Sequence, residues 1–128
     1  MIVDSSALIA ILREEAGFEP LFEKLGRAPS VGVGAPTLAE TGVVLLRTMG
    51  KRARPTLSRF LQEASVTIVP FREEHWPVAL DAYSRFGKGH HPAGLNLGDC
   101  LTYAIARLSG QPLLCVGDDF SKTDLPLA

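Results

Sequence analysis

The stretch Met1-Ile-Val-Asp-Ser-Ser-Ala-Leu-Ile-Ala-Ile-Leu12 decides the fold of this chain. Its first apolar run ends at a single acid, Asp4, and two serines then precede a second apolar run with helical spacing. This order predicts a buried strand, an acid at the carboxyl end of that strand, and the start of a helix. Because ligands of open α/β sheets bind outside the carboxyl ends of the strands, we expect Asp4 to face a functional site.

The remainder of the chain continues to alternate strands with helices. Further strands are predicted at residues 30–34, 66–69 and 113–116, and helices at residues 6–13, 19–25, 37–49, 56–64, 74–86 and 97–109. Strands separated by helices pair in parallel through crossover connections. We therefore predict the α/β class, as a three-layer α/β/α sandwich with a mostly parallel central sheet, in a single domain over residues 1–128.

The composition is that of an ordinary globular protein, with 46% hydrophobic residues, 21% charged residues and a net charge of −1. This charge argues against a surface that is positive throughout, although four acids gathered in one pocket would leave +3 on the rest (−1 + 4). The apolar run at residues 7–12 is too short to span a bilayer, and no basic region precedes it. Cys100 and Cys115 form neither a CxxC motif nor a disulfide framework, so we interpret them as reduced packing residues of a cytoplasmic protein.

Acidic residues occur in four separate stretches of sequence, either directly after a predicted strand or near the start of a predicted helix. Asp4 ends the first strand, and Glu40 lies one turn into the helix after the second. Asp99 is in the first turn of the last helix, and Asp118 and Asp119 follow the last strand. Strand-to-helix junctions share one edge of a parallel sheet, so separate stretches of sequence are expected to bring carboxylates to one face.

Each acid alone also has a structural explanation. Asp99 could only be favoured by the helix dipole, Glu40 could be a solvated side chain, and Asp118 and Asp119 could begin a turn. Together, however, carboxylates repel one another, and some must bind protons or a cation. No lysine or arginine is adjacent to any of them in sequence, so a metal ion is the expected neutraliser.

The type of ligand limits the type of metal. Carboxylate oxygens suit Mg²⁺, Mn²⁺ or Ca²⁺, whereas zinc recruits histidine or cysteine. His90 and His91 lie eight or nine residues before Asp99, which is no familiar ligand spacing, and we interpret them as solvent-facing loop residues. Mg²⁺ held by carboxylates shares its coordination shell with phosphate oxygens, so phosphoryl chemistry is expected.

Four stretches of the chain resemble the PIN-domain ribonucleases, and specifically the VapC toxins of bacterial type II toxin–antitoxin modules. They are Met-Ile-Val-Asp-Ser-Ser-Ala at 1–7, Ala-Pro-Thr-Leu-Ala-Glu at 35–40, Asn-Leu-Gly-Asp-Cys at 96–100, and Leu-Leu-Cys-Val-Gly-Asp-Asp-Phe-Ser-Lys-Thr-Asp-Leu at 113–125. Each motif is weak alone. All four in order, over most of the chain, form a specific signal.

The resemblance implies a metal-dependent endoribonuclease. Asp4, Glu40 and Asp99 fall on acidic positions of the family, with Asp4 and Asp99 as direct Mg²⁺ ligands, for which Mn²⁺ is a plausible substitute. Glu40 would act from the second coordination shell or position the attacking water, and Ser6 would support the site.

The fourth acid of the family is displaced in this chain. Many relatives carry it three residues before the phenylalanine of the closing motif, where this chain has Gly117. Asp118 or Asp119 must then serve, and we favour Asp119.

The resemblance also implies partners: a VapB-like antitoxin that places an arginine in the acidic pocket, a homodimer built on the first helices, and a structured RNA such as tRNA or rRNA. Arg47, Lys51, Arg52 and Lys88 could meet RNA phosphates, although a solvated helix end explains Arg47 and Lys51 equally well. No base-stacking platform is evident. The aromatic residues Phe71, Trp76, Tyr83 and Phe86 are interpreted as core.

Three other functions can be compared with the sequence. A receiver domain needs an aspartate at the end of its third strand, where this chain has Val69-Pro70-Phe71. A haloacid-dehalogenase-type phosphatase needs a second aspartate where this chain has Ser6. A catalytically silent PIN-fold module that only binds a partner protein or RNA is disfavoured by the retained acids, but Gly117 leaves it open.

Overall fold

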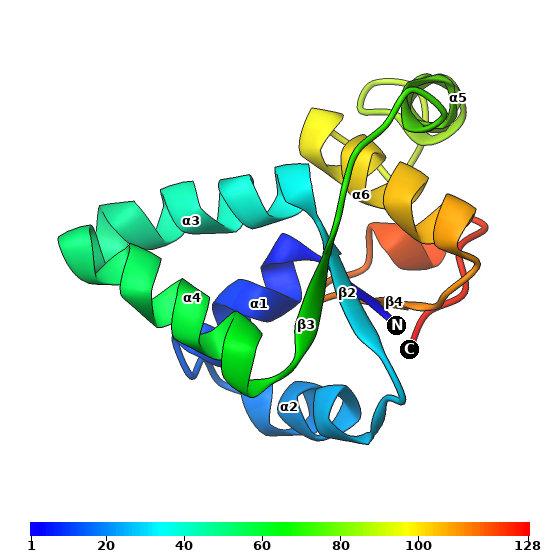
Figure 1. Ribbon diagram of the computed structural model, residues 1–128. Helices are drawn as coiled ribbons and strands as arrows, with labels where there is room; N and C mark the ends of the chain where they lie inside the picture. The colour runs from blue at the N-terminus through cyan, green and yellow to red at the C-terminus, as the bar shows by residue number, and fades with distance from the viewer.

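The computed structural model describes residues 1–128 as an alternation of short strands and longer helices (Figure 1). In chain order the elements are β1 (Ile2–Val3), α1 (Ser5–Leu12), α2 (Phe18–Arg27), β2 (Val31–Gly34), α3 (Ala35–Met49), η1 (Gly50–Arg52), α4 (Ala53–Glu63), β3 (Val66–Val69), α5 (His75–Phe86), α6 (Leu97–Ser109), β4 (Leu113–Leu114) and η2 (Phe120–Lys122). The predicted α/β class is confirmed. The last strand is shorter than the predicted residues 113–116, and α4 begins three residues earlier than predicted.

The sheet has four strands in the order β3-β2-β1-β4, and every pairing between them is parallel. The chain leaves β1 towards β2 and β3 on one side, and β4 occupies the other side of β1. The strand order therefore reverses between β1 and β4. The carboxyl end of the sheet at such a switch point is where α/β proteins place their ligands.

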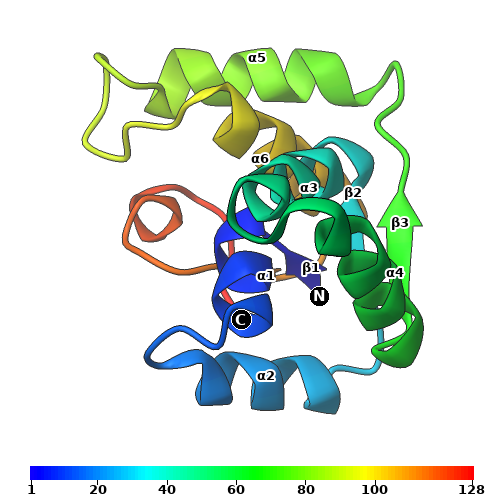
Figure 2. The same cartoon turned by 90° about the vertical axis from the view of Figure 1, so that its left-hand side faces the viewer.

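Side chains alternate between the two faces of the short strands, and this alternation divides the core. Met1 and Val3 pack with α1 and α2, whereas Ile2, between them, packs with α5 and α6. Leu113 and Leu114 divide in the same way. Figure 2 shows the outcome, with α2 and α5 on opposite sides of the molecule and the sheet between them.

The glycines of β2 let α6 approach the sheet closely. A Cβ atom at Gly34 would lie 2.8 Å from Ile105 Cγ1 of α6, and one at Gly32 would lie 3.2 Å from Ile2 Cδ1. The sequence Val-Gly-Val-Gly thus gives one face valine side chains and leaves the other face open for the helix. Because α6 carries Asp99, this close packing also sets the height of that carboxylate above the sheet.

The structure corrects one group of core predictions. Phe86 is buried, with 8% exposed, but Trp76 is 58% exposed and Tyr83 is 40% exposed on the outer surface of α5. One face of α5 packs on α6, and these two aromatic side chains lie beside that face, where they line an open groove with the start of α6. Cys100 is buried and Cys115 partly buried, both as free thiols. None of the helices combines the length and the apolar composition that a membrane crossing requires.

Candidate active site

Asp4 ends β1 as a buried carboxylate, with 5% exposed. Its Oδ2 accepts hydrogen bonds from the Ser6 backbone N–H at 3.1 Å and from the Ser6 hydroxyl at 2.6 Å. The Ser6 hydroxyl in turn accepts from the Val116 N–H at 3.0 Å, which joins Asp4 to the segment after β4. No protein group donates to Asp4 Oδ1, so this oxygen is available to a cation.

Asp99 has two roles at the first turn of α6. Its backbone N–H donates to Asn96 Oδ1 at 2.9 Å, and its Oδ2 accepts from the Asn96 N–H at 3.1 Å, which forms a capping box. The helix-capping explanation is therefore correct but incomplete. Burial, and then the negative charges of Asp4, Asp119 and Glu40, raise the pKa of Asp99 to about 6 despite its hydrogen bond from Asn96.

Glu40 reaches from α3 to the first turn of α6. Its Oε2 lies 2.7 Å from the position that a Cβ atom at Gly98 would occupy, so a side chain at residue 98 would displace the carboxylate from this place. The two helices are joined by a buried hydrogen bond of 2.8 Å between the hydroxyls of Thr37 and Thr102. Sequence reasoning missed Gly98 and this threonine pair. The only local signal was a glycine next to an acid.

The two candidates for the fourth acid differ in their effect on the pKa of Asp99. Both Asp118 and Asp119 are exposed in the segment between β4 and η2, after a turn in which Gly117 has a φ of +92°. The charge of Asp119 raises the pKa of Asp99, whereas Asp118 has no such effect. Of the two acids, Asp119 is therefore the one whose charge reaches Asp99, as the charges of Asp4 and Glu40 do.

The chemistry of these four side chains fits a hard cation. They supply carboxylate oxygens from four separate stretches of sequence, and no lysine, arginine or histidine forms an ion pair with any of them. The neighbouring Cys115 thiol has its pKa raised to about 11 by burial and by the charges of Asp4, Asp119 and Asp99, so it stays protonated. No three acidic, histidine or cysteine side chains converge closely enough to hold a metal by themselves. Mg²⁺ is suited to such a site because it keeps several waters and needs only one or two carboxylates.

The predicted RNA-contacting residues fall in two places. Lys88 follows α5 and lines an apolar groove of about 640 Å³ together with Trp76, Leu97 and Asn96, next to the first turn of α6. Arg47, Lys51 and Arg52 are exposed at the far end of α3 and in η1, away from the turn that carries Glu40 (Figure 1). None of the four forms an ion pair with a carboxylate.

The two loop histidines differ from each other. His90 is exposed, as expected, and its ring meets the edge of Tyr83. His91 is partly buried, which corrects its interpretation as solvent-facing. It accepts a hydrogen bond from the Ala93 N–H at 3.0 Å through Nδ1, and its ring packs against Phe86 at 5.2 Å between centroids. His91 therefore shapes the loop.

An α/β fold with carboxylates gathered at the switch point of its sheet can now be compared with known proteins. Residues 1–125 match the PIN domain family. The structure resembles Mycobacterium tuberculosis VapC20, described as a Sarcin–Ricin loop cleaving toxin, with a TM-score of 0.79 and 19% identity over 99% of this chain and 97% of that chain. It also resembles VapBC2 from Rickettsia felis bound to a DNA fragment from their promoter, with a TM-score of 0.78 and 14% identity over 99% of this chain and 96% of that chain. These two likenesses support the predicted fold.

Relatives with higher identity define the group within the family. Ribonuclease VapC36 of Mycobacterium tuberculosis is 44% identical over 98% of this chain and 91% of the relative. Ribonuclease VapC of Mycolicibacterium smegmatis is 40% identical over 98% of this chain and 97% of the relative. The chain therefore belongs to the PIN-domain family, and within it to the VapC ribonucleases, the toxins of toxin–antitoxin systems. The family predicted from the four motifs is confirmed, and the receiver and phosphatase alternatives are excluded.

Proposed function

We propose that this chain is a Mg²⁺-dependent endoribonuclease toxin that hydrolyses phosphodiester bonds of RNA with an activated water. One observation carries the proposal: the negative charges of Asp4, Asp119 and Glu40 all act on Asp99 at the carboxyl end of the sheet, and no basic side chain pairs with any of these four acids. Such a group needs a cation, and an all-oxygen group selects Mg²⁺ or Mn²⁺.

Each acidic residue receives a role from its surroundings. Asp4 and Asp99 each have one oxygen held by neighbouring donors and the other free of protein donors, which suits direct metal ligands. Glu40 and Asp119 are exposed and receive no hydrogen bonds, which suits groups that accept protons from, or orient, the attacking water. When bound, Mg²⁺ would lower the pKa of a water and offset the charge of the phosphate.

The substrate that we propose is a structured RNA of the tRNA or rRNA class. Two basic regions support this proposal, since Lys88 lies beside the acidic edge and the cluster Arg47, Lys51 and Arg52 lies at the other end of α3. Both regions are unpaired and can neutralise phosphates. The described activity of VapC20 on the Sarcin–Ricin loop gives the proposal a precedent in a protein of the same fold. RNA of this kind places the activity in the cytoplasm.

The partner that we propose is a VapB-like antitoxin, whose arginine would pair with the acidic edge in bidentate fashion. Toxin–antitoxin complexes from Rickettsia felis and Klebsiella pneumoniae share the fold. We also propose a homodimer. The side chains of α1 are mostly covered, whereas Trp76 and Leu80 of α5 are 58% and 63% exposed, so α5 is the better surface for the second copy.

Cleavage assays test the enzymatic proposal directly. The purified protein should cleave tRNA or rRNA with Mg²⁺ or Mn²⁺, EDTA should stop the reaction, and Asp4→Asn should abolish it. Asp118→Asn is the matched control, because Asp118 lies outside the acidic group, and it should retain activity. Undiminished cleavage by Asp4→Asn would overturn the proposal. A protein that binds its antitoxin but cleaves no RNA with either metal would instead be the catalytically silent module.

Bacterial growth gives a second test of the toxin role. Wild-type protein expressed alone should arrest growth, Asp99→Asn should not, and co-expression of the antitoxin should restore growth. Equal toxicity of both forms would contradict metal catalysis.

A further inference from the structure

Three donors from two helices converge on one carboxylate in the C-terminal segment. The Tyr103 hydroxyl donates to Asp124 Oδ1 at 2.6 Å, and Arg85 donates to Oδ2 at 3.1 Å. Arg107 donates to the same Oδ2. Although partial burial raises the pKa of Asp124, its hydrogen bonds from Tyr103 and Arg85 and the two arginine charges bring that pKa below its ordinary value. Asp124 is therefore ionised and held from three directions.

A short, internally bonded segment links Asp124 to Asp119. The Thr123 hydroxyl donates to the Phe120 carbonyl at 2.7 Å, and the Thr123 N–H donates to the same carbonyl at 3.1 Å. The Lys122 N–H donates to the Asp119 carbonyl at 3.3 Å. A displacement at one end of this segment is therefore transmitted to the other end.

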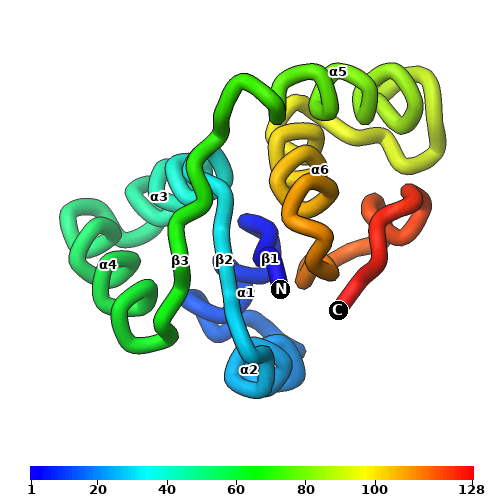
Figure 3. Tube along the Cα trace, turned by 45° about the vertical axis from the view of Figure 1, so that its right-hand side comes forward, coloured from blue at the N-terminus to red at the C-terminus, as the bar shows by residue number.

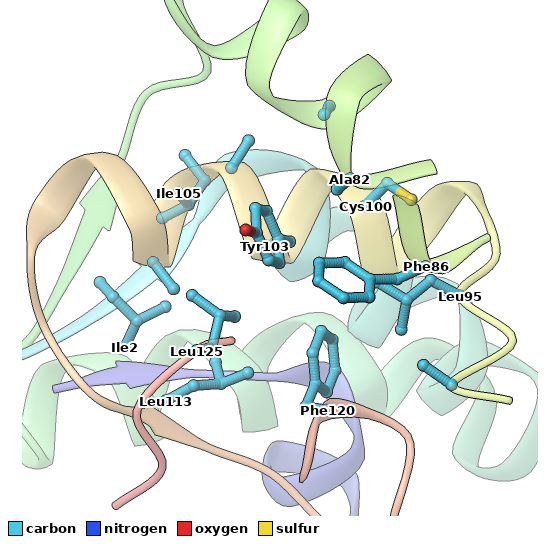
Figure 4. Packing of buried hydrophobic residues seen from close by; sticks show 14 residues of the cluster. Ile2, Ala82, Phe86, Leu95, Cys100, Tyr103, Ile105, Leu113, Phe120 and Leu125 are labelled. Atoms are coloured by element: carbon cyan, nitrogen blue, oxygen red, sulfur yellow. The ribbon is translucent and has the colours of Figure 1, made fainter. Parts of the chain in front are cut away.

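The neighbours of both aspartates anchor the segment in the core. Phe120 follows Asp119 and is 3% exposed, and Leu125 follows Asp124 and is 6% exposed. Figure 4 shows Phe120 and Leu125 pointing towards Tyr103 and Phe86. Figure 3 shows the C-terminal segment running beside α6. Phe120 and Leu125 thus attach the segment to the core at both ends, whereas polar contacts orient the turn between them.

The Asp119 carboxylate has no hydrogen bond of its own, so its place beside Asp99 depends on its backbone. The Asp124 network supplies what is missing, because it ties that backbone to α6, the helix that carries Asp99, through Tyr103 and Arg107. The exposed arginine contacts alone contribute little to stability. Their geometric effect is larger, since they fix the segment relative to the same helix.

We propose that Asp124 is a positioning residue: by binding Tyr103, Arg85 and Arg107, it holds the 119–124 segment, and with it Asp119, in place relative to α6, the helix that carries Asp99. This inference rests on the proposed function, because it assumes that the acidic edge binds a divalent cation. Asp124 itself touches neither metal nor RNA.

Metal affinity tests the proposal, with Asp124→Ala compared against Asp81→Ala. Asp81 pairs with the same Arg85 at 3.5 Å but lies on α5 and does not touch the segment, which makes it a matched control. Asp124→Ala should weaken Mn²⁺ binding, measured by calorimetry, about tenfold, the lower end of what loss of a ligand-orienting partner costs. Asp81→Ala should bind as the wild type does. RNA cleavage should need about tenfold more Mg²⁺, and its rate at saturating Mg²⁺ should also fall, because Asp119 is proposed to orient the attacking water.

Two further variants separate positioning from general damage to the fold. Asp124→Asn keeps an acceptor for Tyr103 and should recover most of the Mn²⁺ affinity. Asp119→Ala should weaken binding as much as Asp124→Ala does, and the double variant should be no worse than either single one, since both act through one carboxylate. Additive losses would overturn the proposal, as would wild-type affinity in Asp124→Ala.

Amide hydrogen exchange provides a second measurement in case Asp124→Ala does not fold. If Asp124→Ala does not fold, Tyr103→Phe takes its place, and faster exchange at residues 120–123 with weaker Mn²⁺ binding is expected. Unchanged exchange and binding would overturn the proposal. Wild-type protein that binds no Mn²⁺ refutes the proposed function and with it the positioning role, whereas a binding wild type with an indistinguishable Asp124→Ala refutes the positioning role alone.

Discussion

The acidic edge consists of two halves that are held in different ways. Asp4 and Asp99 are largely covered, and their carboxylates bind donors two or three residues away in sequence. Glu40 and Asp119 are exposed, and no donor holds either carboxylate. The first pair is built by local sequence, whereas the second pair depends on how α3, α6 and the C-terminal segment pack together.

This difference explains why the two halves tolerate change differently. A local hydrogen bond survives small movements of the fold because its two partners move together. A carboxylate placed only by packing moves whenever its supporting element shifts. Substitutions far from the site should therefore affect Glu40 and Asp119 more than Asp4 and Asp99.

The largest expected effect on the cleavage rate comes from substituting Asp4 or Asp99, the two acids held by local hydrogen bonds. Asp4→Asn and Asp99→Asn should each reduce the cleavage rate by more than about 100-fold, beyond the 10–100-fold typical of residues that only orient a ligand. Glu40→Gln should lose about tenfold, within that range. Rates measured on one RNA at saturating Mg²⁺ provide the check. Equal losses of rate in all three variants would show that Glu40 contributes as much to cleavage as Asp4 and Asp99 do.

Ser6→Ala should break the local support of Asp4. It removes the hydroxyl that donates to Asp4 Oδ2 and accepts from Val116, so we expect about a 10-fold loss of activity and about 1 kcal/mol of unfolding free energy. Ser5→Ala is the control, since the Ser5 hydroxyl makes no hydrogen bond. Denaturant unfolding and cleavage rates measure the two effects. A fully active Ser6→Ala would show that Asp4 does not need this support.

Gly98→Ala should displace Glu40, one of the two acids placed by packing, without replacing any carboxylate. The new Cβ would meet Glu40 Oε2 at 2.7 Å and push it away, so activity should fall about fivefold, less than the 10–100-fold cost of removing an orienting partner outright. Gly26→Ala, where nothing lies within 4 Å, should leave activity unchanged. If both variants are equally active, Glu40 does not act from its observed place.

The pH dependence of stability should report the crowding around Asp99. Because its pKa is about 6 in the fold and 3.8 in the unfolded chain, the metal-free fold binds more protons between these values. Stability from this group is therefore present below pH 3.8 and lost as the pH rises through 6. Asp99→Asn should be more stable than the wild type at pH 7 by about 1 kcal/mol after solvent screening, with no difference at pH 4.

Mg²⁺ provides the complementary measurement for the same group. It should raise the melting temperature of the wild type at pH 7 more than at pH 5, since only the ionised carboxylate binds it well. It should leave the melting temperature of Asp99→Asn nearly unchanged. A difference between wild type and variant that does not vary with pH would contradict the pKa of Asp99.

The smallest effect is expected far from the acids. The double substitution Lys51→Ala and Arg52→Ala should raise the KM for RNA about threefold and reduce the salt dependence of binding, with kcat unchanged, because these residues meet only phosphates. Lys88→Ala should also lower kcat, because Lys88 lies beside the first turn of α6. If Lys88→Ala and the double variant had the same effect on kcat, Lys88 would not lie closer to the reacting phosphate than Lys51 and Arg52 do.

Much of the fold could be predicted because its signals are local. Asn96 and Gly110 cap α6 at the two predicted ends, and β1 (Ile2–Val3) stops directly before Asp4 as expected. The prediction that Trp76 and Tyr83 of α5 belong to the core was wrong, because the periodicity of an amphipathic helix does not reveal how wide its buried face is. α6 packs along one face of α5 and leaves Trp76 and Tyr83 exposed beside that face.

By itself, the sequence determined the family, the parallel α/β order and the acids at the strand ends, because strand length, helix caps and motif spacing act over a few neighbouring residues. Only the tertiary structure decided that the charge of Asp119 acts on Asp99, that Gly98 lies against Glu40, and that Asp124 binds two helices. These outcomes depend on contacts between residues that are at least 17 positions apart in the sequence. No local pattern of residues records the distances at which such segments pack.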